Sequence, residues 1–245
     1  MIVLREKVTA LNSKEIIQKV MSEERSLLTE KESKDLIKNA GLNVVDTRLA
    51  TSKEEAIGIG DQFGYPVVVK IASKEVTHKS DAGGVKLGIQ SSEELGNAYD
   101  EIYASVADKF PKAAIDGVTV QQSARQGVEV IIGMFTDAQF GPVLMFGLGG
   151  IFVEVIKDVS FRIVPLAQKD SKRMIREIKG YPLLEGYRGQ ERVDITILES
   201  IVLKLSEFIQ QYPEIKEFDL NPIFAYCDGA VVVDARIILN MKDIK

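Results

Sequence analysis

Apolar positions in the first half of the chain recur at helical spacing in several short segments, each opened by a capping residue. Asn12, Thr29, Ser52 and Ser92 are the expected caps, and glutamate lies three residues after Thr29 and after Ser52. Serine or threonine followed by glutamate at this spacing is typical of a capping box at a helix start. The pattern predicts helices within 12–24, 29–40, 52–63 and 92–110.

Runs rich in β-branched residues separate these helices and dominate the middle of the chain. The run YPVVVKIA at 65–72 is the clearest strand, and strands are also expected within 43–50, 85–90, 117–124, 127–137, 142–150, 151–158 and 160–167. Helices near 171–179 and 194–211 follow, and a hairpin that turns at Asp228 and Gly229 closes the chain. Short glycine-containing turns favour antiparallel pairing in the second half.

This order of elements predicts an α/β (α+β) protein with two subdomains. The segment PKAAID, at 111–116, interrupts the pattern. We therefore expect an N-terminal extension over 1–25, a first subdomain over 26–115 and a second over 116–245. Ligands often bind where two such units meet.

Composition and charge narrow the classes of function. The chain has 245 residues, is 45% hydrophobic and 27% charged, and carries a net charge of −5. Such a balance gives no support to a nucleic-acid partner. The apolar stretch at the N-terminus is too short for a signal peptide, and no segment approaches the ~20 apolar residues of a membrane helix. A single cysteine, Cys227, excludes an internal disulfide. We expect a cytoplasmic protein that is not bound to a membrane.

Two lysines and a glycine-rich loop predict a phosphate site. Neither a P-loop nor a dinucleotide-binding fingerprint is present. However, Lys70 ends an apolar strand, where an ammonium group that cannot reach water needs an anion. The loop that follows holds Gly83 and Gly84, whose backbone N–H groups could face an anion, and then Lys86. The alternatives are a lysine that reaches solvent at the strand end and an ordinary hairpin.

Oxygen ligands for a metal occur in the last hairpin. Asp219 and Asn221 are two residues apart on one strand, and Asp234 follows on the next. Carboxylate and amide oxygens suit Mg²⁺, which also binds water and substrate phosphates. We predict that Asn221 and Asp234 hold the metal and interpret Asp219 as a solvated aspartate. Glu129 and Glu154 interrupt apolar strands and need partners, such as sugar hydroxyls, a metal or Arg162.

Longer segments give a more specific resemblance. These are LLTEKESKDLIKNAGL, GYPVVVKIAS, THKSDAGGVKLGI, the stretch from Gly127 to Leu166 and EFDLNPI. Over roughly Ser26 to Leu239 the chain resembles the ATP-grasp β subunits of ADP-forming acetyl-CoA synthetases. The resemblance implies an ATP-grasp fold with the nucleotide between two subdomains. It also implies formation of ATP from ADP and phosphate as an acyl-CoA is converted to the free acid.

The resemblance also assigns roles to single residues. His78, the only histidine, matches a residue that relays the phosphoryl group. Lys70 matches a contact to nucleotide phosphates, which the family's glycine loop, matching 83–88, covers, and Glu129 matches a position near the nucleotide sugar. Asn221 and Asp234 match the metal ligands of succinate–CoA ligases. We also expect Gln121 in the nucleotide-binding set.

The chain lacks a CoA-binding Rossmann half, so the resemblance implies an acid–CoA ligase subunit that needs a CoA-binding α subunit as its partner. The expected assembly is α2β2. The resemblance also implies Mg²⁺ as the cofactor and ATP or ADP as the nucleotide substrate. A stand-alone ATP-grasp ligase that forms an acyl phosphate is the alternative enzyme. A nucleotide-sensing subunit without catalysis is the third possibility.

Overall fold

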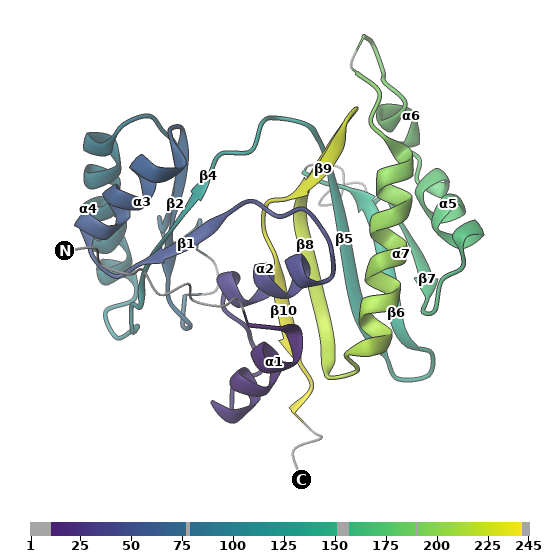
Figure 1. Ribbon diagram of the computed structural model, residues 1–245, viewed down its shortest axis with the longest axis horizontal. Helices are drawn as coiled ribbons and strands as arrows, with labels where there is room; N and C mark the ends of the chain where they lie inside the picture. Colours follow the sequence, from purple (N-terminus) through teal and green to yellow (C-terminus); the bar gives the residue numbers. More distant parts are fainter. Residues whose placement is uncertain (1–10, 77–78, 151–156, 190, 242–245) are drawn as a thin grey trace, which may run out of the picture.

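Two antiparallel sheets form the framework of the protein (Figure 1). The computed structural model describes residues 11–76, 79–150, 157–189 and 191–241. In the first sheet the strand order is β1-β4-β2-β3, and in the second it is β10-β8-β5-β6-β7, with β9 paired to β8. The fold is therefore the mixed α/β architecture expected from the pattern, with antiparallel pairing throughout the described strands.

The first sheet is the smaller unit. Its strands are β1 (Thr47–Ala50), β4 (Gly117–Gln122), β2 (Val67–Ala72) and β3 (Val85–Ile89), and helices α3 (Lys53–Phe63) and α4 (Ser92–Lys109) pack against it. Val67, Val69 and Ile71 of β2 face these helices with no exposed surface. Because side chains alternate along a strand, Lys70 points to the opposite face.

The second sheet is covered by helices on one face. Its strands are β5 (Val128–Asp137), β6 (Gly141–Leu148), β7 (Val159–Ile163), β8 (Ile215–Tyr226), β9 (Gly229–Val232) and β10 (Arg236–Leu239). Helices α5 (Gln168–Glu177), α6 (Tyr181–Leu184) and α7 (Ile195–Gln211) share a core with this sheet, which includes Leu144, Phe146 and Phe218.

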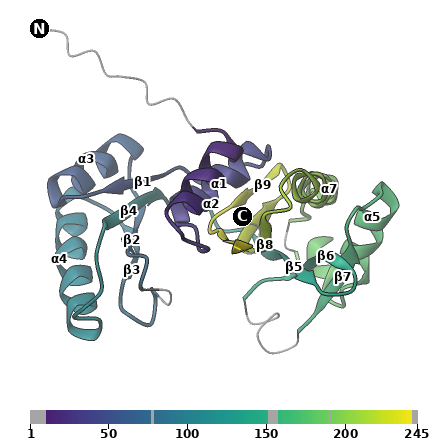
Figure 2. The ribbon, with the colours of Figure 1, turned by 90° about the horizontal axis from the view of Figure 1, so that it is seen from below.

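Helices α1 (Ser13–Ser22) and α2 (Glu30–Asn39) lie between the two sheets (Figure 2). Both begin with capping boxes, at Thr29 as the sequence predicts and at Asn12, which was expected only as a cap. Their apolar faces join the core of the second sheet, so α1 is packed into the fold although 1–25 was expected to be an extension. Helix α4 is capped by Ser91 instead of Ser92, because the Ser91 side chain accepts the N–H of Glu94.

Two chain segments connect the units, and both are held by the β8–β9 hairpin. Val232 donates its N–H to the Asn43 carbonyl at 2.9 Å and accepts that of Val45 at 3.0 Å. In the second connection, the guanidinium of Arg125 lies 4.1 Å from the centre of the Tyr226 ring, whose hydroxyl donates to the Arg125 carbonyl at 2.7 Å. Because β4 pairs in the first sheet while α2 packs on the second, we propose 47–122 as the small unit instead of 26–115.

Candidate functional site

A cavity of about 1290 Å³ lies where α2, strand β2, the β2–β3 loop and the last hairpin meet. Its walls come from both units. Lys70 and Lys79 line it from the small unit, and Asp219, Asn221 and Asp234 line it from the second sheet. A cavity with cations on one wall and oxygen ligands on the other suits an anion that carries a divalent cation.

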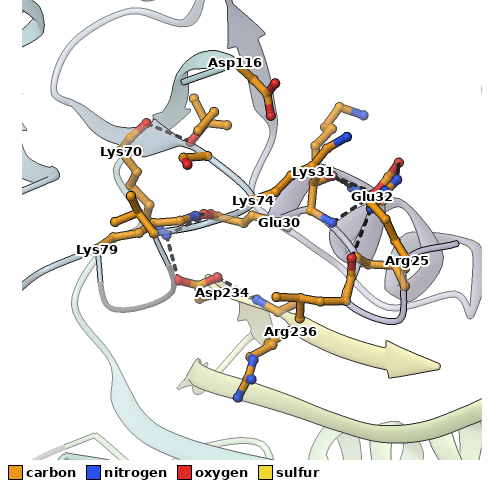
Figure 3. A pocket seen from close by; sticks show the side chains of 18 of the residues that line it. Arg25, Glu30, Lys31, Glu32, Lys70, Lys74, Lys79, Asp116, Asp234 and Arg236 are labelled. Atoms are coloured by element: carbon orange, nitrogen blue, oxygen red, sulfur yellow. Dashed lines mark hydrogen bonds and ion pairs between the residues drawn. The ribbon is translucent and has the colours of Figure 1, made fainter. Parts of the chain in front are cut away.

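Glu30, in the first turn of α2, lies at the centre of the positive wall (Figure 3). Its Oε1 accepts from Lys34 Nζ at 2.9 Å and from Lys70 Nζ at 2.8 Å, and its Oε2 accepts from Lys79 Nζ at 2.7 Å. The Glu30 side chain is only 4% exposed. One buried carboxylate therefore gathers cations from a helix, a strand and a loop.

Lys34 and Lys70 each have a second set of partners, and these differ. Lys34 Nζ also donates to Thr47 Oγ1 at 2.9 Å and to Gln121 Oε1 at 2.7 Å, which ties α2 to β1 and β4 of the first sheet. Lys70 Nζ also donates to Asp234 Oδ2 at 2.8 Å, and the Asp234 side chain is 39% exposed. Lys34 is thus part of the packing, whereas Lys70 reaches the cavity.

Charge pairing in this cluster shifts the pKa values of Glu30 and Lys70 towards their charged forms, whereas burial lowers the pKa of Lys34. Burial alone would raise the pKa of Glu30, but the ammonium groups, led by Lys70, lower that pKa below its ordinary value. Burial would lower the pKa of Lys70, yet the Glu30 and Asp234 carboxylates raise it. Lys70 therefore stays a cation near neutral pH, although the residue is only 6% exposed.

The oxygen ligands gather at one level of the hairpin. Ile223 pairs with Val232 and Asp219 with Arg236, so Asn221 lies across from Asp234. Asp219 shares a face of β8 with Asn221, since the two are two residues apart. Burial, and then the charge of Asp234, raise the pKa of Asp219. Two carboxylates that disfavour each other's charge in a cavity are an arrangement that a cation stabilises.

The structure places the loop glycines beside the cavity wall. Gly84 donates its N–H to the Lys79 carbonyl at 2.7 Å, and a Cβ on Gly84 would lie 2.6 Å from Ile71 Cγ2. Gly83 has a φ of +69° and donates to the Ser80 carbonyl at 3.0 Å. Both N–H groups thus close the loop in this structure. Val76 and Lys79 line the cavity, and His78 lies outside the described residues.

Five of the predicted residues do not line the cavity, namely the two loop glycines, Lys86, Gln121 and Glu129. Lys86 forms an ion pair with Glu101 of α4, because its neighbour Val85 takes the position beside Lys70 and turns Lys86 to the helical face. Gln121 is buried and accepts from Lys34. Glu129, on β5, is half-buried, and its carbonyl accepts the N–H of Gly149 at 2.8 Å.

The sequence did not point to Glu30 or Lys34 as site residues, and Asp219 was not assigned to the metal. Glu30 and Lys34 have the spacing of one helical turn, which is the available signal, but the segment was interpreted only as a capped helix. Asp219 was interpreted as solvated, whereas it is half-buried and lines the cavity. Within the described part of the chain, no three or more His, Cys, Asp or Glu side chains cluster as a metal site. Nor does any described helix have the length and hydropathy to span a membrane.

A known protein family matches most of the chain. The ATP-grasp domain family matches residues 19–239. The β subunit of the ADP-forming acetate–CoA ligase I of Pyrococcus furiosus is 48% identical over 227 residues, which are 93% of this chain and 97% of that protein.

Two solved structures of the dinucleotide-forming acetyl-coenzyme A synthetase 1 of Candidatus Korarchaeum cryptofilum align with 94% of this chain and all of theirs. The first contains coenzyme A and Ca-AMPCP and has a TM-score of 0.91 at 47% identity. The second contains coenzyme A and Mg-AMPPCP, with its phosphohistidine segment pointing towards the nucleotide binding site, and has a TM-score of 0.83 at 44% identity.

Proposed function

Because the chain belongs to the ATP-grasp family, and within it to the β subunits of ADP-forming acetate–CoA ligases, we propose that it binds ADP or ATP and transfers a phosphoryl group between the nucleotide and a partner subunit. The overall reaction is acyl-CoA, ADP and phosphate to free acid, CoA and ATP. The observation that carries the proposal is the cavity between the sheets, with Lys70 and Lys79 facing Asp219, Asn221 and Asp234.

The positive wall supports a phosphate site. Lys70 and Lys79 come from different elements, yet their ammonium groups lie within 2.8 and 2.7 Å of one carboxylate. Charged hydrogen bonds to phosphate oxygens are about twice as strong as neutral ones. We assign both lysines to the nucleotide phosphates. The roles predicted for Gly83, Gly84, Lys86, Gln121 and Glu129 remain predictions, and Lys86 has the weakest geometric support because its ammonium pairs with Glu101.

The negative wall fits Mg²⁺. The donor set of carboxylate and amide oxygens is what this cation prefers. The pKa of Asp219 is raised by burial first and by the charge of Asp234 second, and a cation would offset both. We propose Asn221 and Asp234 as the ligands that would hold it. Mg²⁺ would supply charge compensation for the phosphates. Our metal site uses few protein ligands, in keeping with a cation that also binds water and substrate.

His78 is proposed as the phosphoryl carrier. A neutral imidazole nitrogen attacks the phosphorus of a phosphohistidine on the partner; the partner's N–P bond breaks, and its imidazole regains the proton that His78 loses. An oxygen of the β-phosphate of ADP then attacks, the N–P bond of His78 breaks, ATP forms, and the freed His78 nitrogen takes up a proton from water. His78 follows Val76 and precedes Lys79, both of which line the cavity.

A CoA-binding α subunit completes the enzyme in this proposal, with α2β2 as the expected assembly. The relative from P. furiosus is named as a subunit β, and the K. cryptofilum structures contain coenzyme A. The acyl chemistry and the first phosphohistidine would belong to that partner, and transfer to the nucleotide to this chain.

The test separates the two half-reactions on the reconstituted enzyme. We expect His78→Ala to abolish ATP formation from acyl-CoA, phosphate and ADP, while the partner is still phosphorylated by acyl-CoA and phosphate. Radiolabelled phosphate on each subunit, resolved by electrophoresis under alkaline conditions, measures both steps. Near-normal ATP formation by His78→Ala would exclude the relay and leave a nucleotide site without a covalent carrier.

A further inference from the structure

The single negative charge of Glu30 is in contact with three ammonium groups. One carboxylate accepts from Lys34, Lys70 and Lys79, and Asp234 supplies the only other anion paired with these lysines among the described residues. A buried carboxylate is ordinarily satisfied by a single well-placed cation, and extra buried cations cost desolvation free energy. A surplus of positive charge at the wall of a cavity therefore points to an anionic ligand.

Packing alone does not explain the arrangement. The contact between α2 and the small unit needs only Lys34, which bonds Glu30 on its own helix and Thr47 and Gln121 on the first sheet. Lys70 and Lys79 add two more ion pairs between that unit and Glu30, and unlike Lys34 both also line the cavity. The Lys79 side chain is 23% exposed, so its charge reaches the place where a ligand would lie.

We propose that Glu30 is a positioning residue for the nucleotide phosphates, a role that rests on the function proposed above. Its two carboxylate oxygens hold the ammonium groups of Lys70 and Lys79 side by side before the nucleotide arrives (Figure 3). A lysine side chain has several rotatable bonds, and ordering it costs free energy. Glu30 orders both lysine side chains during folding, so the free-energy cost of ordering them does not reduce the affinity for the nucleotide.

The rigidity of Glu30 itself comes from Lys34. Glu30 and Lys34 are one turn apart on α2, and the helix is fixed from both sides. Leu36 and Ile37 of α2 are fully buried in the core of the second sheet, while Lys34 bonds the first. The carboxylate is therefore anchored to both units at once. A helix held in this way can set the position of two lysines that come from a strand and a loop.

Glu30→Asp is the decisive variant, because it keeps the charge and shortens the side chain by one methylene. We expect the affinity of the full chain for Mg·ADP, measured by calorimetry, to fall by about fivefold or more, which is within the range typical of coupled sites. Glu30→Gln, which keeps the length and removes the charge, is expected to weaken binding as well. Unchanged affinity in Glu30→Asp would overturn the proposal, as would tighter binding in Glu30→Gln.

A double-mutant cycle with Lys79→Ala tests whether Glu30 acts through the lysines. If it does, the loss caused by Glu30→Gln becomes smaller when Lys79 is already absent. Strict additivity would overturn the positioning role. The cycle also provides the answer if Glu30→Asp fails to fold.

A matched control separates positioning from a general loss of stability. Glu199 of α7 is another buried carboxylate, 9% exposed at its side chain and paired with Arg176 at 2.8 Å, but it does not line the cavity. We expect Glu199→Gln to lower the melting temperature and leave ADP affinity unchanged. If Lys70→Met has no effect on ADP binding, the proposed nucleotide site fails; if Lys70→Met weakens binding and Glu30→Asp does not, only the role of Glu30 fails.

Discussion

Replacement of Lys70 by methionine tests the proposed phosphate site most directly. Methionine keeps a long unbranched side chain in a position that is 6% exposed, so little cavity is created in the wall. The change removes the ammonium group that contacts both Glu30 and Asp234 at 2.8 Å. Glu30 keeps Lys34 and Lys79 as partners, and the buried carboxylate is still compensated.

The expected magnitude follows from the contact that is lost. A hydrogen bond to a charged group contributes about 1.5–3 kcal/mol. Each 1.4 kcal/mol changes a dissociation constant about tenfold, so one such contact to a nucleotide phosphate corresponds to about ten- to a hundredfold. Asp234 adds to the loss, since in Lys70→Met its charge faces the phosphates without its ammonium partner.

Calorimetric titration of the purified chain with ADP in excess Mg²⁺ measures this change. Lys53→Met is the matched control: Lys53 is an exposed lysine paired with Asp100 at 2.5 Å, remote from the cavity lining. Both variants should retain a cooperative thermal transition. If Lys70→Met binds ADP as tightly as Lys53→Met does, the ammonium group does not contact the nucleotide, and the assignment of the cavity fails.

Two further variants test the remaining walls of the site. Asp234→Asn should raise the Mg²⁺ concentration needed for half-maximal ADP binding by about tenfold, because it replaces the only carboxylate of the two proposed ligands by a neutral amide; an unchanged Mg²⁺ requirement would show that the Asp234 carboxylate does not hold the cation. Lys86→Met should weaken ADP binding by less than about threefold, in line with an exposed pair to Glu101; a tenfold loss in the same titration would instead support the phosphate contact predicted from the sequence.

Local patterns were sufficient to predict most helices and strands. The predicted caps Asn12 and Thr29 begin α1 and α2 in the structure, and β2 lies within the predicted run 65–72. Each of these signals acts within a few residues, so no tertiary information is needed to interpret it. The family resemblance was confirmed as well, since the ATP-grasp family matches residues 19–239. The motifs that carried the resemblance are spread over most of the chain.

Residues whose role depends on long-range contacts were harder to predict. Glu30 is separated from Lys70 by 40 positions, and Lys70 from Asp234 by 164. A glutamate in the first turn of a helix interacts favourably with the helix dipole. The sequence therefore accounts for a glutamate at position 30 without any partner side chain. Asp219 likewise appeared solvated until the register of β8 placed it beside Asp234.

The sequence also did not predict to which face of the sheet each lysine side chain points. Period-two alternation fixes relative faces within one strand, but the relation between strands needs the register. Here Lys70 pairs with Val85, so Lys86 faces α4 and Val85 the cavity. Two lysines on either side of a glycine loop can therefore serve different faces of the same sheet.

The position of α2 explains how two separate units can share one site. Its apolar side belongs to the core of the second sheet, while Lys34 bonds Thr47 and Gln121 of the first. The ion pair between Lys70 and Asp234 joins the units again at the cavity itself. The β8–β9 hairpin, which carries Asn221, also holds both connecting segments through Val232 and Tyr226. The two walls of the proposed nucleotide site are therefore already in contact, and phosphates that bind Lys70 would displace Asp234 from it.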